Sequence, residues 1–192
     1  MTTIETLIDF IIKSYSKRNF WVLFGGICLC LVGFGVASIL IGVGNLIENT
    51  NQPIQLLDTL FYYSQETAYQ QLKAYGEYGR EVCLFSTLVL DSFFPLVYGA
   101  FWAILLGKLL GKTAYRWLVL LPLLVIIVDY LENTHTAILL INFPEVCPLV
   151  VYWGSLFTMT KWILIALVLF SISFGFFLRN RKNFILEINQ ED

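Results

Sequence analysis

Four long apolar stretches constrain the fold of this sequence more than any other feature. They cover residues 19–47, 82–107, 117–142 and 149–178. A helix of about 20 apolar residues crosses the hydrocarbon core of a bilayer, so each stretch is long enough to span it. None of them alternates between polar and apolar residues as a barrel strand does. The sequence therefore predicts an all-α fold, a polytopic integral membrane protein built as a four-helix bundle in a single membrane domain.

The composition agrees with a bilayer as the solvent. Of the 192 residues, 58% are hydrophobic and 14% are charged, whereas about a quarter of the residues of a soluble domain are charged. A water-soluble fold of this length would have too few polar side chains to cover its core. The net charge of −2 gives no reason to expect a nucleic-acid partner. The lipid bilayer is the partner that we expect.

Basic residues gather in alternate segments between the apolar stretches. They precede the first stretch, separate the second from the third and follow the fourth, as Lys13, Lys17, Arg18, Lys108, Lys112, Arg116, Arg179, Arg181 and Lys182. Because basic segments stay in the cytoplasm, this pattern places residues 1–18 and the tail 179–192 there, and makes the mostly acidic segment 48–81 an extracytoplasmic loop. The sequence has no Asn-x-Ser/Thr acceptor, which fits a bacterial protein. We therefore expect the cytoplasmic (inner) membrane of a bacterium.

Two segments outside the apolar stretches have patterns of their own. Ile4, Leu7, Ile8 and Ile11 recur at helical spacing, which predicts an amphipathic helix on the cytoplasmic interface. A plain extension of the first membrane helix is the alternative. The loop 48–81 combines an apolar pattern with the tyrosines Tyr62, Tyr63, Tyr69, Tyr75 and Tyr78. Tyrosine prefers the headgroup level, so the loop is predicted to form helical or re-entrant segments as a lid over the bundle.

The first apolar stretch carries small residues at helical spacing. Its run is about twice as long as the 7–15 apolar residues of a signal peptide, so we expect it to be retained as a membrane helix. Gly26, Gly33 and Ala37 lie along one ridge, continued by Gly44, and a second ridge contains Gly35, Ser38 and Gly42. Small residues let helices approach closely. They favour packing inside the bundle, with a homo-oligomer or a larger membrane complex as the alternative.

Ionisable residues occur in the middle of three of the four stretches, as Asp91, Asp129, Glu132 and Lys161. At 1.5 Å per residue they lie roughly 12–18 Å from the outer ends of their helices, in one layer of the membrane. Each would cost about 2.5–3.5 kcal/mol if it faced lipid, so we expect these residues to face one another or water. Three carboxylates exceed the charge of one lysine. A proton, His135 or a bound cation has to neutralise the excess.

Helical spacing supports their convergence. Asp129, Glu132 and Asn133 share one helix face with Thr136, and Asp91 shares another with Tyr98. His135 follows Glu132 by three residues and is expected to pair with it. Pro95 has no N–H to donate to the carbonyl of Asp91, so the helix should kink there and leave that carbonyl free. The predicted ligand or proton pocket consists of Asp91, Tyr98, Asp129, Glu132, Asn133, His135 and Lys161.

Motifs with a more specific chemistry are weak or missing. Glu132 and His135 have the Glu-x-x-His spacing of di-metal helical bundles, but those sites need two such motifs and further glutamates, and this chain has one histidine. We therefore expect no metal site, and the sequence identifies no cofactor. Cys83 and Cys147 both fall near the outer surface, where either a disulfide or two free thiols are compatible with the sequence.

Three functions remain open at this stage. The first is binding or transport of a proton, a cation or an amphiphilic, lipid-like ligand in the acidic pocket. The second is an intramembrane enzyme acting on a lipid or isoprenoid, with Asp91 and Glu132 as acid and base. The third is a non-catalytic small subunit of a larger membrane complex, in which the acidic residues hold helices together. The charge excess favours the first two, and the small residues of the first stretch favour the third.

Overall fold

The computed structural model describes residues 3–48 and 52–191, with side chains as far as residue 181. Within these ranges the regular secondary structure is helical and no strand is formed. Leu46 and Pro53 form an isolated β-bridge. Four helical segments are long and apolar enough to cross a membrane, at Lys17–Ile41, Gly76–Leu110, Arg116–Asn142 and Pro148–Arg181. The predicted all-α four-helix bundle is confirmed. Residues 49–51 of the predicted loop and residue 192 of the predicted tail lie outside the described ranges.

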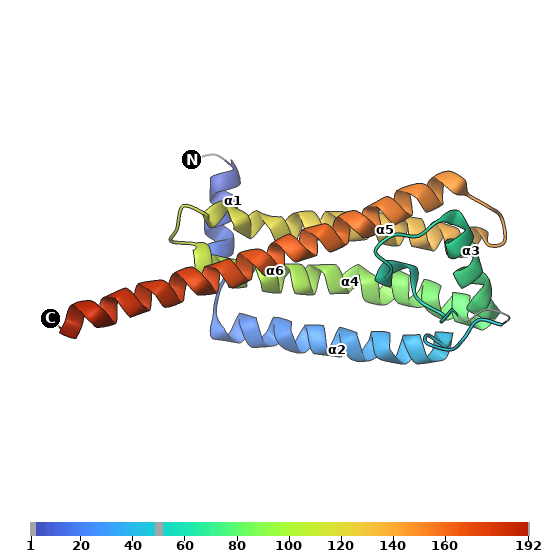
Figure 1. Ribbon diagram of the computed structural model, residues 1–192, viewed down its shortest axis with the longest axis horizontal. Helices are drawn as coiled ribbons and strands as arrows, with labels where there is room; N and C mark the ends of the chain where they lie inside the picture. Colours follow the sequence, from blue (N-terminus) through green and yellow to red (C-terminus); the bar gives the residue numbers. More distant parts are fainter. Residues whose placement is uncertain (1–2, 49–51, 192) are drawn as a thin grey trace.

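The four long helices are sequential neighbours, as Figure 1 shows. They are α2 (Lys17–Ile41), α4 (Gly76–Leu110), α5 (Leu121–Asn142) and α6 (Pro148–Glu191). A short 3-10 helix, η2 (Arg116–Leu120), leads directly into α5. Helix α4 is central, because it packs against α2, α5 and α6, and α5 also packs against α6. Helix α2 therefore stands at the edge of the bundle.

The outer surface of the long helices is apolar. Leu29 and Ile39 of α2 and Phe170 of α6 are 74%, 79% and 71% exposed. Soluble monomers rarely expose extensive apolar surface. This surface and the lengths of the four helices are compatible with a multi-pass membrane protein, in which lipid would cover these side chains.

The helix boundaries differ from the predicted spans for local reasons. Helix α2 begins after Ser16, whose hydroxyl accepts a hydrogen bond from the Asn19 amide at 3.0 Å, and it ends at Ile41 rather than at 47. Gly42 adopts the left-handed conformation with φ of 82° and stops the helix, as C-terminal glycines do. Helix α4 starts at Gly76, before the predicted start at 82. Helix α6 continues through most of the predicted tail to Glu191.

Helix α1 (Thr3–Lys13) lies across one end of the bundle in Figure 1. Ile8 and Ile11 are buried in the apolar cluster that α4 and η2 also form, whereas Ile4 and Leu7 are exposed. Arg116 of η2 forms an ion pair of 2.7 Å with Asp9. The predicted amphipathic helix is confirmed. It is separate from α2, so the alternative of a plain extension is wrong.

The predicted lid, residues 53–75, lies at the opposite end of the bundle (Figure 1). It contains the 3-10 helix η1 (Leu57–Thr59) and helix α3 (Gln65–Ala74). Tyr63 and Tyr75 are buried within it, whereas Tyr62 is exposed. Tyr69 ties the lid to the α5–α6 connection, because its hydroxyl donates to the Glu145 carbonyl at 2.7 Å and accepts from an amide of that connection. The lid is helical and partly buried, as predicted.

The small residues of α2 divide into two groups. A Cβ atom on Gly26 would lie 3.1 Å from Val97, and one on Gly33 would lie 3.1 Å from Leu90. These two glycines therefore allow the close contact between α2 and α4 inside the bundle. Gly35, on the second ridge, has open space around it. Gly26 and Gly33 therefore serve internal packing, as the sequence favoured, whereas Gly44 lies beyond the end of α2 and does not continue this ridge.

Candidate functional site

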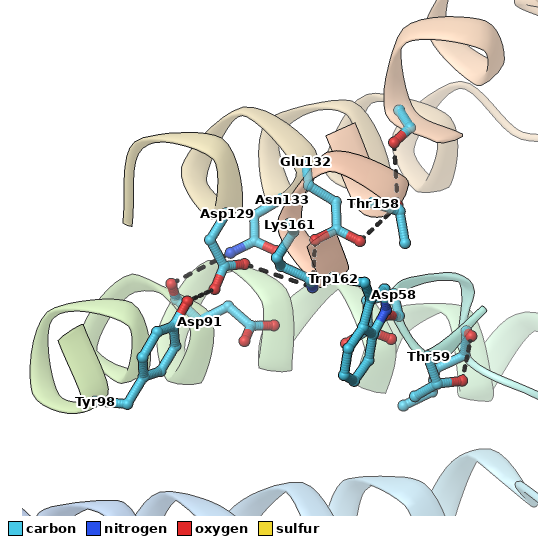
Figure 2. A network of polar contacts seen from close by, with 12 residues as sticks. Asp58, Thr59, Asp91, Tyr98, Asp129, Glu132, Asn133, Thr158, Lys161 and Trp162 are labelled. Carbon is cyan, nitrogen blue, oxygen red and sulfur yellow. Dashed lines mark hydrogen bonds and ion pairs between the residues drawn. The ribbon is translucent and has the colours of Figure 1, made fainter. Parts of the chain in front are cut away.

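Lys161 lies at the centre of the polar network in Figure 2. Its side chain is buried, and the segment of α6 that carries it is mostly apolar. The Lys161 Nζ atom forms an ion pair with Glu132 and a second one, at 3.8 Å, with Asp129. The convergence expected from the sequence is confirmed for these three residues. Lysine needs these partners, because an isolated charge among apolar helices is costly.

Glu132 is fully buried between α5 and α6. One carboxylate oxygen faces Lys161, and the other accepts a hydrogen bond of 2.7 Å from the Thr158 hydroxyl. Thr158 is also fully buried and stands three residues before Lys161, on the same helix face. The sequence interpretation missed Thr158, although its spacing from Lys161 was a usable signal.

Asp129 joins α5 to α4. Its Oδ2 atom accepts a hydrogen bond from the Tyr98 hydroxyl, and its Oδ1 atom faces Lys161. The helices come close here because Gly99 has no side chain, and a Cβ atom on it would collide with Ile126 of α5. Glycine next to Tyr98 therefore brings the tyrosine within reach of Asp129.

The backbone beside Pro95 is satisfied by side chains of α5. The Asp91 carbonyl, which Pro95 leaves without its helical donor, accepts a bond of 3.4 Å from the Asn133 amide. The neighbouring Ser92 carbonyl accepts a bond of 2.6 Å from the Tyr130 hydroxyl. As predicted, the Asp91 carbonyl lacks its donor within α4, and the Asn133 amide donates to it instead. Helix α4 continues through Pro95.

The Asp91 carboxylate differs from the other two acids of the cluster. In the part of the chain that the structure describes, it forms neither an ion pair nor a hydrogen bond. It borders a small cavity of about 20 Å³ between the lid and the helices. The polar residues lining this cavity are Asp58, Tyr75, Ser86, Thr87, Asp91, Asn133 and Thr136. A space of this size holds about one water molecule.

Thr136 and Asp58 add two features to this cavity. The Thr136 hydroxyl is buried and has no hydrogen-bond partner among the described residues. Asp58 belongs to η1 of the lid, so a fourth carboxylate borders the cavity from outside the long helices. The Asp58 carbonyl accepts a bond of 3.1 Å from the Trp162 indole, which fixes the lid next to Lys161 (Figure 2). Carboxylate, hydroxyl and amide oxygens are ligands suited to hard cations.

Tyr63 of the lid packs beside α5 and α6. Its amide donates to the Ser155 hydroxyl at 2.9 Å, and its ring is 2% exposed. A Cβ atom on Gly154 would lie 2.8 Å from the Tyr63 hydroxyl, so glycine is needed to admit it. Burial, with a smaller effect of the Glu132 charge, raises the pKa of Tyr63. The phenol therefore stays neutral.

His135 does not take the role expected from its spacing. Its Nδ1 atom contacts the Leu131 carbonyl at 2.7 Å, and its ring packs against Phe157 with centroids 5.1 Å apart. The expected pair with Glu132 is absent from the described structure, because Glu132 points toward α6 instead. His135 therefore does not neutralise the acidic cluster. Cys83 and Cys147 are both free thiols, so the disulfide alternative does not apply to this structure.

Comparisons of the chain with protein-family models, with curated proteins and with solved structures give no match. The function therefore has to be argued from the site itself. Among the described residues, His, Cys, Asp and Glu do not form a group of three that could hold a metal ion. The chemistry available is that of carboxylates, hydroxyls, one amide and one ammonium group.

Proposed function

We propose that this chain is a multi-pass membrane protein whose buried acidic cluster binds an exchangeable proton or small cation, as a step in proton or cation binding or transport. One observation carries the proposal. Lys161 is engaged by Glu132 and Asp129, while Asp91 has no ion pair with any described residue and borders a cavity of about 20 Å³.

The energetic argument rests on charge balance. One ammonium group offsets one carboxylate in full, so two of the three acids Asp91, Asp129 and Glu132 need another positive charge. A carboxylate left charged at mid-membrane depth would cost about 2.5–3.5 kcal/mol or more. Taking up a proton or a cation removes this cost, and Asp91 is the acid with room beside it.

The size of the cavity limits the ligand. About 20 Å³ is enough for one water molecule or one small ion, and it is far below the several hundred cubic ångströms of organic ligand sites. The oxygen atoms around it suit a proton relayed by water, or a hard monovalent cation. The lone Thr136 hydroxyl supports an occupant that supplies its missing partner.

The orientation is part of the proposal. The basic residues at the α1 end support a cytoplasmic location for both termini, and a bacterial cytoplasmic membrane. The lid would then lie on the extracytoplasmic side, so that the cavity below it would be reached from outside.

Asp91→Asn tests the proposal. Thermal unfolding of the purified protein would be followed in mild detergent at neutral and mildly acidic pH, with sodium or potassium salts against an organic cation too large for the cavity. We expect acid or the preferred small cation to raise the Tm of the wild-type protein, because a ligand that binds the folded state stabilises it. Asp91→Asn should remove this response.

Glu81→Gln is the matched control, because Glu81 is an exposed carboxylate of the same helix. This variant should keep the wild-type response. An Asp91→Asn protein with an unchanged response to both pH and cations would refute the assignment to Asp91.

A groove on the α4–α5 face supports an amphiphile as the second candidate ligand. It measures about 250 Å³ and reaches Asp91 and Asn133 between apolar walls that include Leu88 and Ile138. A cationic headgroup at Asp91 with its chain in this groove would satisfy the same charge. Mass spectrometry of lipid extracts from the purified protein would detect such a ligand. An acid and base role for Asp91 and Glu132 is less favoured, because Glu132 is fully buried and held by Lys161.

A further inference from the structure

A second cavity lies at the end of the bundle where α1 crosses it, away from the lid and the acidic cluster. It measures about 470 Å³, is open on one side, and lies between the end of α1, the end of α4 and part of α6. Lys108, Lys112 and Arg179 line it, together with the hydroxyl residues Tyr15 and Thr113. None of the described residues in its lining is acidic.

The close packing of three segments forms this cavity. Helix α1 approaches α4 because a Cβ atom on Gly107 would lie 3.1 Å from the Ile12 Cα atom. Helix α6 approaches the same part of α4 because one on Gly175 would lie 2.9 Å from Leu109. The two glycines therefore determine how near the basic side chains of α4 and α6 lie to the end of α1.

One of the basic side chains of this cavity contacts a tyrosine. Lys108 Nζ donates to the Tyr15 hydroxyl at 2.5 Å and lies 4.4 Å from the centre of its ring. Lys112 lies in the turn after α4, and it lines the same cavity as Lys108. Asp9, an acid of the adjoining helix, is already paired with Arg116. Among the described residues of the lining, Lys108, Lys112 and Arg179 therefore have no acidic partner.

We propose that this cavity binds the phosphate headgroup of an anionic phospholipid. A phosphate offsets the repulsion between the cations and accepts hydrogen bonds from lysine, arginine and hydroxyl groups. Ile12 and Leu178 provide apolar surface at the same cavity for the start of an acyl chain. An amphipathic helix such as α1 lies at the headgroup level of a bilayer. The site is independent of the proton or cation proposed at Asp91.

Lipid titration of the full chain tests this site. Binding of phosphatidylglycerol, phosphatidylcholine and inorganic phosphate would be followed by native mass spectrometry and by thermal unfolding in mild detergent. We expect saturable binding of phosphatidylglycerol and much weaker binding of phosphatidylcholine. Lys108→Gln, Lys112→Gln and Arg179→Gln should each weaken the apparent Kd for phosphatidylglycerol about fivefold, the usual effect of one basic residue near an anionic membrane surface.

Lys17→Gln and Arg18→Gln are the controls, because both residues are exposed at the start of α2 and stand outside the cavity lining. They should change the apparent Kd less than about twofold, as expected for charges outside the site. Equal weakening by control and cavity variants would overturn the proposal in favour of diffuse attraction. Binding of inorganic phosphate as tight as that of phosphatidylglycerol would also overturn it. Arg179 is exposed, so its variant should fold even if a lysine variant does not.

Discussion

Replacing Lys161 with methionine should destabilise the protein, and removing one acid together with it should restore part of the loss. Methionine keeps most of the length of the side chain and removes its charge. Glu132 is fully buried and, among its contacts with described residues, would then keep the hydrogen bond from Thr158. Breaking a buried ion pair from one side usually costs about 3–5 kcal/mol, because the remaining charge is uncompensated.

Proton uptake sets an upper limit to this cost. Placing a proton on a glutamate carboxylate at pH 7 requires about 3.7 kcal/mol, from its ordinary titration near pH 4.3. We therefore expect Lys161→Met to lose about 3–4 kcal/mol at neutral pH. For a chain of this size, that corresponds to a decrease in Tm of roughly 6–16 °C. The loss should shrink as the pH falls, because the acid then becomes neutral at less cost.

The assay is a double-mutant cycle on thermal unfolding in mild detergent. Lys161→Met combined with Glu132→Gln should be more stable than the sum of the two single losses predicts, since the pair then contains no charge. Lys161→Met with Asp129→Asn should show a smaller coupling, because that ion pair spans 3.8 Å and Asp129 keeps its bond from Tyr98. Strict additivity in both cycles would refute the reasoning that these charges neutralise one another.

Three further predictions concern topology, helix packing and the lid. A cysteine placed at Lys73 should react with an impermeant reagent from outside the cell, and one placed at Lys112 should not; outside labelling at 112 would reverse the proposed orientation. Gly99→Ala should lower stability by about 1–3 kcal/mol, because its Cβ atom overpacks the contact with α5, whereas Gly25→Ala has open space and should be tolerated. Gly154→Ala should displace the lid tyrosine and speed amide hydrogen exchange in residues 57–75; unchanged exchange would contradict the role assigned to that glycine.

Periodicity was sufficient to predict which acidic and amide residues share one face of α5. Asp129, Glu132 and Asn133 share a face because a helix repeats every 3.6 residues, and this was visible in the sequence. Lys161 could be added because a charge in an apolar helix needs a partner at the same depth. Pro95 likewise indicated that the Asp91 carbonyl would seek a donor outside its own helix, and Asn133 provides one.

Other parts of the site depend on tertiary structure that spacing does not encode. Spacing put His135 within reach of Glu132, but reach does not determine which way two side chains turn, and the partners on α6 determined the direction of Glu132. Tyr63 was expected at the headgroup level with the other lid tyrosines. It is buried instead, because Gly154 leaves room for it on α6. The sequence alone does not show which loop side chain will fill the space beside a glycine of a distant helix.

Asp58 changes the charge balance on which the functional argument depends. The apolar stretches contain three carboxylates and Lys161, whereas Asp58 belongs to the acidic loop between the first two stretches. The lid places it at the same cavity as Asp91, with its backbone fixed by Trp162. A cation or proton bound there would interact with an acid from the lid and an acid from α4. Its binding and closure of the lid would then be linked, because displacing the lid would remove one of the two carboxylates. The lid and the excess charge therefore belong to the same functional hypothesis.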